Sequence, residues 1–91
     1  MNRTLSDKQL RALQQMADGW TLAQSTKHGD GYFYRVVNDR REYSKEYTGV
    51  SETTIKALDR RGLIDRSGIV SERQEWKLTG AGIQLLAGVQ A

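Results

Sequence analysis

Residues that can cap the N-terminus of a helix occur at three places in this chain, and their spacing limits the fold more than any other feature of the sequence. The first start is Ser6, which can cap a helix while Gln9 reaches back to complete a capping box. A similar cap, flanked by apolar residues that can form a hydrophobic staple, recurs at Ser51, and Thr79 offers a third start. These positions predict helices over residues 7–18 and 52–61, and a short helix from Thr79.

Glycines mark where the first two helices should end. Gly19 and Gly62 occupy the position after a helix end, where a residue in the left-handed conformation is common. In the last helix, the apolar side should face inward, and its members are Ile83, Leu86 and Val89.

The pattern changes to strands between the first two helices. Residues 32–37 are rich in strand formers and follow a turn-forming segment at 28–31. A two-residue loop at Asp39-Arg40 would pair Val36 with Tyr43. The sequence therefore predicts a small β-meander. Residues 42–48 fit a strand or a helix, and we expect the strand.

A second hairpin is predicted after the second helix, over residues 64–77. Its strands would be joined by a polar loop that contains Gly68. The chain has 91 residues, no proline and no internal repeat, which leaves room for one domain and offers no linker. We expect one α+β domain over residues 1–91.

Composition excludes several classes of site. The chain has no cysteine and one histidine, His28, so disulfides, thiolate zinc sites and cysteine nucleophiles are excluded, and no metal or cofactor is expected. No apolar stretch approaches the roughly 18 residues that a membrane span needs, and residues 1–16 lack the pattern of a secretory signal. We expect a soluble, cytoplasmic protein without a membrane partner.

The charge of the chain permits an anionic partner without requiring one. The formal net charge is +3 and the isoelectric point is near 9.4, but no segment is conspicuously basic. At about 100° per residue, the helix over 52–61 turns its apolar residues inward and Thr53, Lys56 and Arg60 outward. This face suits a DNA major groove, although any solvated helix face can have a similar composition.

Residues 50–64, followed by a hairpin and then Leu78–Leu86, resemble the second half of winged-helix DNA-binding domains. The resemblance covers about residues 50–87 and is strongest to the MarR-type regulators. It implies that the helix over 52–61 is the recognition helix and the hairpin is the wing. Upstream, Lys45 and Thr48 stand where a helix-turn-helix needs apolar residues, so a strand is expected in place of the positioning helix.

The resemblance also implies a set of DNA contacts. The implied contacts on the recognition helix are Thr53, Thr54, Lys56, Arg60 and Arg61, and those on the wing are Arg66, Arg73 and Lys77. Arg40 and Arg41 at the predicted turn suit contacts to the phosphate backbone, or serve only to solubilise the turn.

Two functional hypotheses follow from these observations. The first is a DNA-binding protein, a small prokaryotic or phage transcriptional regulator that places the helix over 52–61 in the major groove of double-stranded DNA. A homodimer is expected, because one short helix makes few contacts and residues 83–89 have apolar surface. The alternative is a winged-helix-like protein-interaction module, such as a phage or toxin-type inhibitor of a host nucleic-acid enzyme. The element order also loosely resembles that of the small bacterial YjhX-type proteins, described as toxin-like through topoisomerase inhibition.

Catalysis is not expected. Asp65 and the Glu75-x-Lys77 pair match the acid, acid-x-lysine layout that holds magnesium in one class of nucleases. Strand alternation produces Glu-x-Lys often, however, and the chain is short for that fold.

The aromatic residues of the predicted meander allow two interpretations. They are interleaved with basic side chains, so they can form a stacking platform for single-stranded nucleic acid. More often, tyrosines in such a pattern are cross-strand pairs that cover one side of a small sheet. The aromatic residues are Tyr32, Phe33, Tyr34, Tyr43 and Tyr47, and the basic ones are Arg35, Arg40, Arg41 and Lys45.

Overall fold

The computed structural model describes residues 5–45 and 49–90, and over these residues it contains three helices and one five-stranded antiparallel sheet. The α+β class predicted from the sequence is confirmed. The helices are α1 (Asp7–Ala17), α2 (Glu52–Arg60) and α3 (Gly80–Gln90). The strands are β1 (Thr21–Ser25), β2 (Gly31–Val37), β3 (Arg40–Tyr43), β4 (Ile64–Val70) and β5 (Arg73–Leu78).

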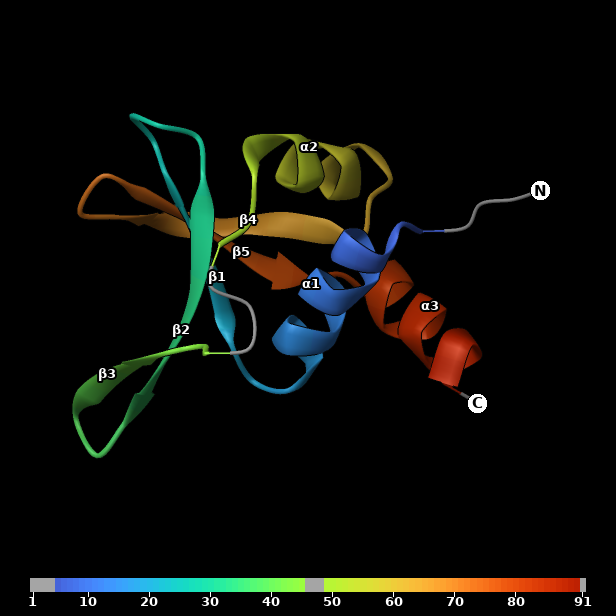
Figure 1. Ribbon diagram of the computed structural model, residues 1–91, viewed down its shortest axis with the longest axis horizontal. Helices are drawn as coiled ribbons and strands as arrows, with labels where there is room; N and C mark the ends of the chain where they lie inside the picture. The colour runs from blue at the N-terminus through green and yellow to red at the C-terminus, as the bar shows by residue number, and fades with distance from the viewer. Residues whose placement is uncertain (1–4, 46–48, 91) are drawn as a thin grey trace.

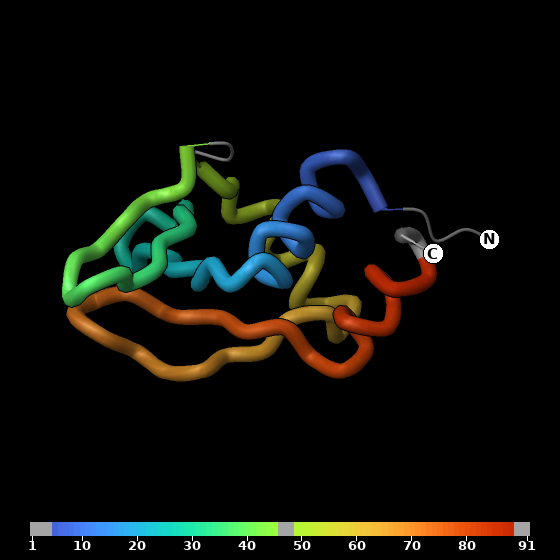
Figure 2. Tube along the Cα trace, turned by 90° about the horizontal axis from the view of Figure 1, so that it is seen from below, coloured from blue at the N-terminus to red at the C-terminus, as the bar shows by residue number. Residues whose placement is uncertain are grey.

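The sheet joins two hairpins through one central strand. Its strand order is β3-β2-β1-β5-β4, so β1 pairs with β2 on one side and with β5 on the other. Figure 1 shows the three helices gathered together, while the β2–β3 and β4–β5 hairpins extend away from them. Figure 2 shows α1 and α3 at the same end of the molecule. None of the described helices is long and apolar enough to cross a membrane.

The core lies between the three helices and one face of the sheet. Alternate residues of the strands point to this face, among them the fully buried Leu22 and Phe33. Burial of these apolar side chains is the main favourable contribution to folding. The helices contribute Leu13 from α1, Ile55 from α2 and Leu86 from α3 to the same cluster.

Local chemistry sets the boundaries of α1 and α2 to within one residue of the prediction, whereas α3, which was predicted to be short, has 11 residues. Ser6 and Gln9 form the complete capping box of α1, and the Ser51 hydroxyl accepts a hydrogen bond from a backbone N–H in the first turn of α2. Gly62, with φ of 73°, donates its N–H to the carbonyl of Asp59 at 2.9 Å. The N–H of Leu63 reaches the carbonyl of Leu58 at 3.1 Å. These two bonds form the Schellman motif that the sequence indicated.

The turn of the β2–β3 hairpin lies one residue earlier than the sequence suggested. Its two central residues are Asn38 and Asp39, both with positive φ, so Tyr34 and not Val36 pairs with Tyr43. A tight hairpin turn with two left-handed residues suits Asn and Asp, whereas the predicted loop would require Arg40 to adopt that conformation. The predicted loop at Asp39-Arg40 was wrong for this reason.

The segment after this turn is a strand, which confirms that interpretation for residues 42 and 43. Residues 46–48, including Tyr47 and Thr48, lie outside the described residues. No helix occurs in the described part of the segment between β2 and α2.

The second hairpin forms, but Gly68 does not lie in its loop. The turn is Ser71-Glu72, again with two positive φ angles, and Gly68 lies inside β4 with φ of 151°. The register shifts between Arg66 and Gly68, which marks a β-bulge. Glycine suits this position because only glycine readily adopts such a backbone conformation.

Helix α3 packs through a different side than predicted. Leu86 is buried as expected, but Ile83 is 57% exposed. Gly82 faces the rest of the protein instead of Ile83. Its backbone lies so close to Leu63 that a Cβ atom at Gly82 would be only 2.4 Å from the Leu63 carbonyl oxygen. The close approach of α3 to this carbonyl turns Ile83 outward. The side chain of Val89 lies outside the described part of the chain.

Candidate nucleic-acid interface

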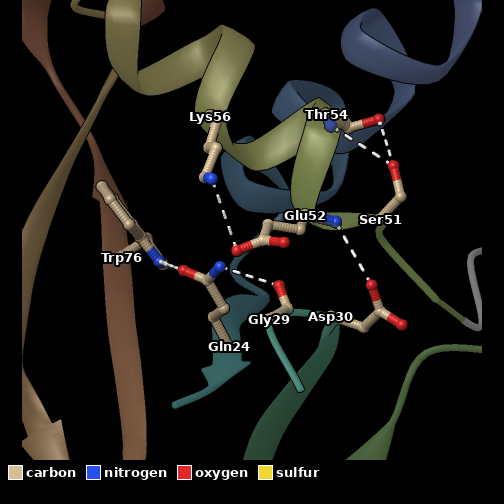
Figure 3. A network of polar contacts seen from close by, with 8 residues as sticks. All are labelled: Gln24, Gly29, Asp30, Ser51, Glu52, Thr54, Lys56 and Trp76. Atoms are coloured by element: carbon tan, nitrogen blue, oxygen red, sulfur yellow. Dashed lines mark hydrogen bonds and ion pairs between the residues drawn. The ribbon is translucent and has the colours of Figure 1, made fainter. Parts of the chain in front are cut away.

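The first turn of α2 is fixed by the β1–β2 hairpin. Val50 and Gly31 exchange backbone hydrogen bonds of 2.8 and 2.7 Å, which tie the segment before α2 to the start of β2. The backbone N–H of Glu52 donates to a carboxylate oxygen of Asp30 at 3.3 Å (Figure 3). An acid at this helix end also interacts favourably with the helix dipole. These contacts anchor α2 on the sheet.

The outward face of α2 agrees with the helical projection. Thr53, Lys56 and Arg60 are exposed, while Ile55 and Leu58 are buried in the core. Asp59 is also exposed, on the flank that the projection gives to the acids. A helix that carries a threonine and two cations along one face can reach bases and phosphates together.

Thr54 does not belong to this face. It is only 8% exposed, and its hydroxyl lies 3.0 Å from the hydroxyl of Ser51. Its side chain therefore supports the start of α2, and we correct its expected role as a DNA contact. In helical projection Thr54 lies close to the buried side of α2, so the periodicity of the sequence indicates its burial.

Glu52 lies beside the cationic face and partly offsets it. Its carboxylate is 3.6 Å from Nζ of Lys56, and both side chains are about half exposed or more. Exposed pairs of this kind contribute about 0–1 kcal/mol. Figure 3 shows the Glu52 carboxylate reaching toward Lys56 from below. Lys56 can therefore exchange this partner for a phosphate at little cost.

A groove lies between the start of α2, the β1–β2 turn and the β4–β5 hairpin. It has a volume of about 410 Å³, and its walls include Glu52, Arg66 and Gln24. Trp76 forms part of the wall, and its indole N–H donates to Oε1 of Gln24 at 3.0 Å (Figure 3). The guanidinium of Arg66 lies 5.9 Å from the centre of the Trp76 ring. Arg66 thus faces the same groove as α2.

We use the name α2 surface for Thr53, Lys56, Arg60 and Arg66. Arg61 adjoins it, since it is the exposed residue that caps the C-terminal end of α2. The structure therefore brings five of the predicted contacts to one side of the molecule.

The other two predicted wing contacts lie on the opposite face of the sheet. Arg73 and Lys77 alternate with the buried Trp76 along β5, so they point away from α2. The guanidinium of Arg73 donates to the hydroxyl of Tyr32 at 2.6 Å. The predicted wing set is split between the two faces. In β5 the side chains alternate between the two faces, so Arg73 and Lys77 lie on the face opposite to Trp76. Arg66 pairs with Trp76 and therefore lies on the same face as Trp76.

Arg40 and Arg41 also separate from the α2 surface. Arg41 lies on the same sheet face as Arg73, with its guanidinium 4.9 Å from the centre of the Tyr34 ring. Arg40 pairs with Val37 beside the β2–β3 turn and is exposed. The two arginines therefore point to opposite faces of the sheet.

A hydrogen bond missed by sequence reasoning crosses the sheet. The hydroxyl of Tyr34 on β2 donates to the carboxylate of Glu75 on β5. Burial and then this bond to Glu75 raise the pKa of Tyr34, which keeps its proton in place as the donor. The bond to the Tyr32 hydroxyl raises the pKa of Arg73. No motif encodes these contacts, because they depend on β1 lying between β2 and β5.

The acids of the nuclease-like pattern have other partners. Glu75 accepts a hydrogen bond from the Tyr34 hydroxyl, and a carboxylate oxygen of Asp65 accepts one from the backbone N–H of Arg66 at 2.9 Å. Within residues 5–45 and 49–90, no group of three or more acidic, histidine or cysteine side chains is arranged to hold a metal ion.

Comparison of the chain with protein-family models, with curated proteins and with solved structures finds no match. The arrangement of side chains on the fold therefore carries the functional argument alone.

Proposed function

We propose that this protein binds double-stranded DNA by placing α2 in the major groove, and that it is a small prokaryotic or phage transcriptional regulator. The observation that carries the proposal is the outward face of α2, where Lys56 and Arg60 are exposed together with Thr53. Cations of this kind supply the affinity for phosphates, and hydroxyl groups can bond to base edges.

The element order supports a winged-helix-like interpretation of the fold. Strand β1 follows α1 and pairs with β5, and the β4–β5 hairpin directly follows α2. A recognition helix followed by a hairpin in the same sheet is the arrangement that the resemblance implies. The β2–β3 hairpin stands where a positioning helix would be expected, so α2 is supported by strands instead.

The dimensions of α2 fit this role. Its nine residues give a length of about 13 Å, comparable with the major groove, which is about 12 Å wide. Its first turns carry Thr53 and Lys56, and the N-terminal part of a recognition helix is the part that contacts bases. Arg60 lies near the other end and can reach the phosphate backbone. Arg66, on β4 across the protein groove from α2, can contact the same DNA phosphate backbone.

A titration of fluorescently labelled duplex DNA tests this proposal. The α2 surface and Arg61 supply four cations, and the logarithm of the binding constant should fall with the logarithm of salt by about 0.9 for each phosphate neutralised. We therefore expect binding at low salt with a slope of about −3 to −4, measured by fluorescence anisotropy. Absence of binding at low salt, or binding that does not depend on salt, would contradict the proposal.

The homodimer expected from the sequence stays a prediction. The exposed Ile83 is consistent with an apolar contact through α3. A dimer would also bring two α2 helices to one duplex, which offsets the small number of contacts made by each.

A protein-interaction module is the second candidate function. The observation that favours it is the end of the β4–β5 hairpin, where Ile69 is 68% exposed and Val70 is 48% exposed. A hairpin end that contacts phosphates would be expected to carry basic residues, whereas exposed apolar residues suit a protein partner. If the duplex titration fails, capture of a host nucleic-acid enzyme from a bacterial lysate would favour this candidate.

A further inference from the structure

The sheet face that points away from the helices carries an ordered cluster of aromatic and basic side chains. The strand residues of the core, such as Phe33 and Trp76, alternate with this cluster and point to the opposite face. We call the cluster the tyrosine face, and its members are Tyr32, Tyr34, Tyr43, Arg41 and Arg73.

The central strand allows the tyrosine rings to lie across the sheet. The hydroxyl of Tyr34 on β2 bonds to Glu75 on β5, although β1 runs between these strands. Neighbouring strands are about 4.8 Å apart, so a ring standing upright on β2 would not reach this partner. Ala23 on β1 is fully buried and small, which leaves room for the ring above it. The rings of Tyr32 and Tyr34 therefore lean over β1.

Hydrogen bonds at the ring ends hold this arrangement. Tyr34 is fixed by Glu75, and Tyr32 accepts a bond from Arg73 at 2.6 Å. The Tyr32 ring centre lies 6.2 Å from that of Tyr34 and 5.6 Å from that of Tyr43. Tyr43 is 54% exposed at the edge of this aromatic surface. The planes of the neighbouring rings are tilted by 47° and 54°, so the three rings form one cluster with a defined geometry before any ligand binds, which reduces the entropic cost of binding.

The chemistry left for a ligand favours nucleic acid over a protein. In protein interfaces, tyrosine commonly contributes its hydroxyl as a hydrogen-bonding group. The hydroxyls of Tyr32 and Tyr34 already have partners within the sheet. What remains is ring surface with two cations at it, because the guanidinium of Arg41 lies over the Tyr34 ring and that of Arg73 bonds to the Tyr32 hydroxyl. Planar bases stack on such rings, and guanidinium groups bind phosphates or stack on bases themselves.

The charges on this face have the sign that such a ligand requires. Two arginines lie on opposite sides of the rings, and the nearest acid, Glu75, is engaged by the Tyr34 hydroxyl. Lys77 shares this face, but its positive charge is offset by the negative charge of Asp65, its cross-strand partner. A strand that crosses the rings would therefore meet a cation at each side.

We propose that the tyrosine face binds single-stranded nucleic acid, with unpaired bases stacked on Tyr43 and its neighbouring rings and with phosphates held by Arg41 and Arg73. This site is separate from the α2 surface and does not depend on the function proposed for it. Duplex DNA does not fit the tyrosine face, because its bases are stacked on one another and do not expose their faces.

The test uses a labelled oligothymidine of about 12 nucleotides, within the range of about 4–16 that one OB fold, another small β-sheet domain, covers. Tyr43→Ala should weaken its binding by about fivefold to a hundredfold, because a stacking ring is lost. Tyr43→Phe is the matched control, since it keeps the ring, and it should bind as the wild type does. Arg41→Ala should reduce the salt slope by about 0.7. Thermal unfolding checks that each variant is folded.

Further arms separate this proposal from duplex binding and from general attraction to polyanions. Lys56→Ala with Arg60→Ala should leave oligothymidine binding unchanged, and an oligouridine of equal length shows whether DNA or RNA binds more tightly. Absence of oligothymidine binding at low salt would overturn the proposal. Equal weakening by Tyr43→Phe and Tyr43→Ala would also overturn it, as would an unchanged affinity in Tyr43→Ala.

Discussion

Replacing Gly82 by alanine is expected to destabilise the protein by about 1–3 kcal/mol, as overpacking of a tight core contact does. The added Cβ would lie 2.4 Å from the carbonyl oxygen of Leu63 and 3.0 Å from a methyl group of Leu78. The carbonyl cannot turn away freely, because it accepts the N–H of Thr79 at 3.1 Å. The gain in helix propensity from alanine, about 0.5–1 kcal/mol, is too small to offset the clash.

Gly88→Ala is the matched control for this prediction. Gly88 lies in the same helix, and a Cβ atom there would meet nothing within 4 Å. Its replacement should leave stability unchanged or raise it by up to about 1 kcal/mol. Urea denaturation of both variants measures the difference. If Gly82→Ala were as stable as Gly88→Ala, the packing of α3 against Leu63 described above would be wrong.

Removing Lys56 and Arg60 together, as the double alanine variant, is expected to cause the largest loss of DNA affinity. A hydrogen bond to a charged group such as a phosphate contributes about 1.5–3 kcal/mol, and each tenfold in affinity corresponds to about 1.4 kcal/mol. Duplex affinity should therefore fall by about tenfold to a hundredfold. The salt slope should also become shallower by about 2, because two phosphate contacts are lost. Anisotropy titrations at several salt concentrations measure both quantities.

The control for this variant removes the same charges from another helix. Lys8→Ala with Arg11→Ala also lowers the formal net charge from +3 to +1, but these exposed residues belong to α1. Because only the total charge changes, duplex affinity should fall much less than in the α2 variant. Equal losses in the two double variants would mean that α2 is not the contact element.

Local chemistry explains why the helices could be predicted from the sequence. A cap such as Ser51 and a left-handed glycine such as Gly62 act through bonds to residues within six positions, so the sequence alone contains both partners. The outward face of α2 follows from the same short-range periodicity. Ile55 and Leu58 must face the core, and Lys56 and Arg60 are then turned outward.

The turns were predicted less well, because several residues tolerate the same backbone conformation. Asn38 and Asp39 both adopt positive φ, and choosing Asp39 with Arg40 moved the strand pairing by two residues. Gly68 was assigned to a loop because glycine is common in turns, yet it forms a bulge inside β4. In both hairpins the error is one of position, and the hairpins themselves were predicted.

The split of the basic residues between two faces required the strand order. That Arg73 and Lys77 point away from Trp76 follows from alternation. That Arg73 meets Tyr32, and Glu75 meets Tyr34, does not follow from any local pattern, because these residues are 41 positions apart and meet across β1. The two interpretations of the tyrosines were therefore left open by the sequence. The cross-strand cluster and its flanking arginines are tertiary features.

Mapping of backbone amide resonances during titration with duplex DNA tests the role of α2 most directly. If α2 binds in the DNA major groove, the largest chemical-shift changes should occur at Thr53, Lys56 and Arg60. Arg66, on β4 across the protein groove from α2, should also change. Residues of the tyrosine face should change little, because duplex DNA does not stack there. Shift changes confined to Ile69–Glu72 or to the tyrosine face, with α2 unaffected at saturation, would contradict the proposed function.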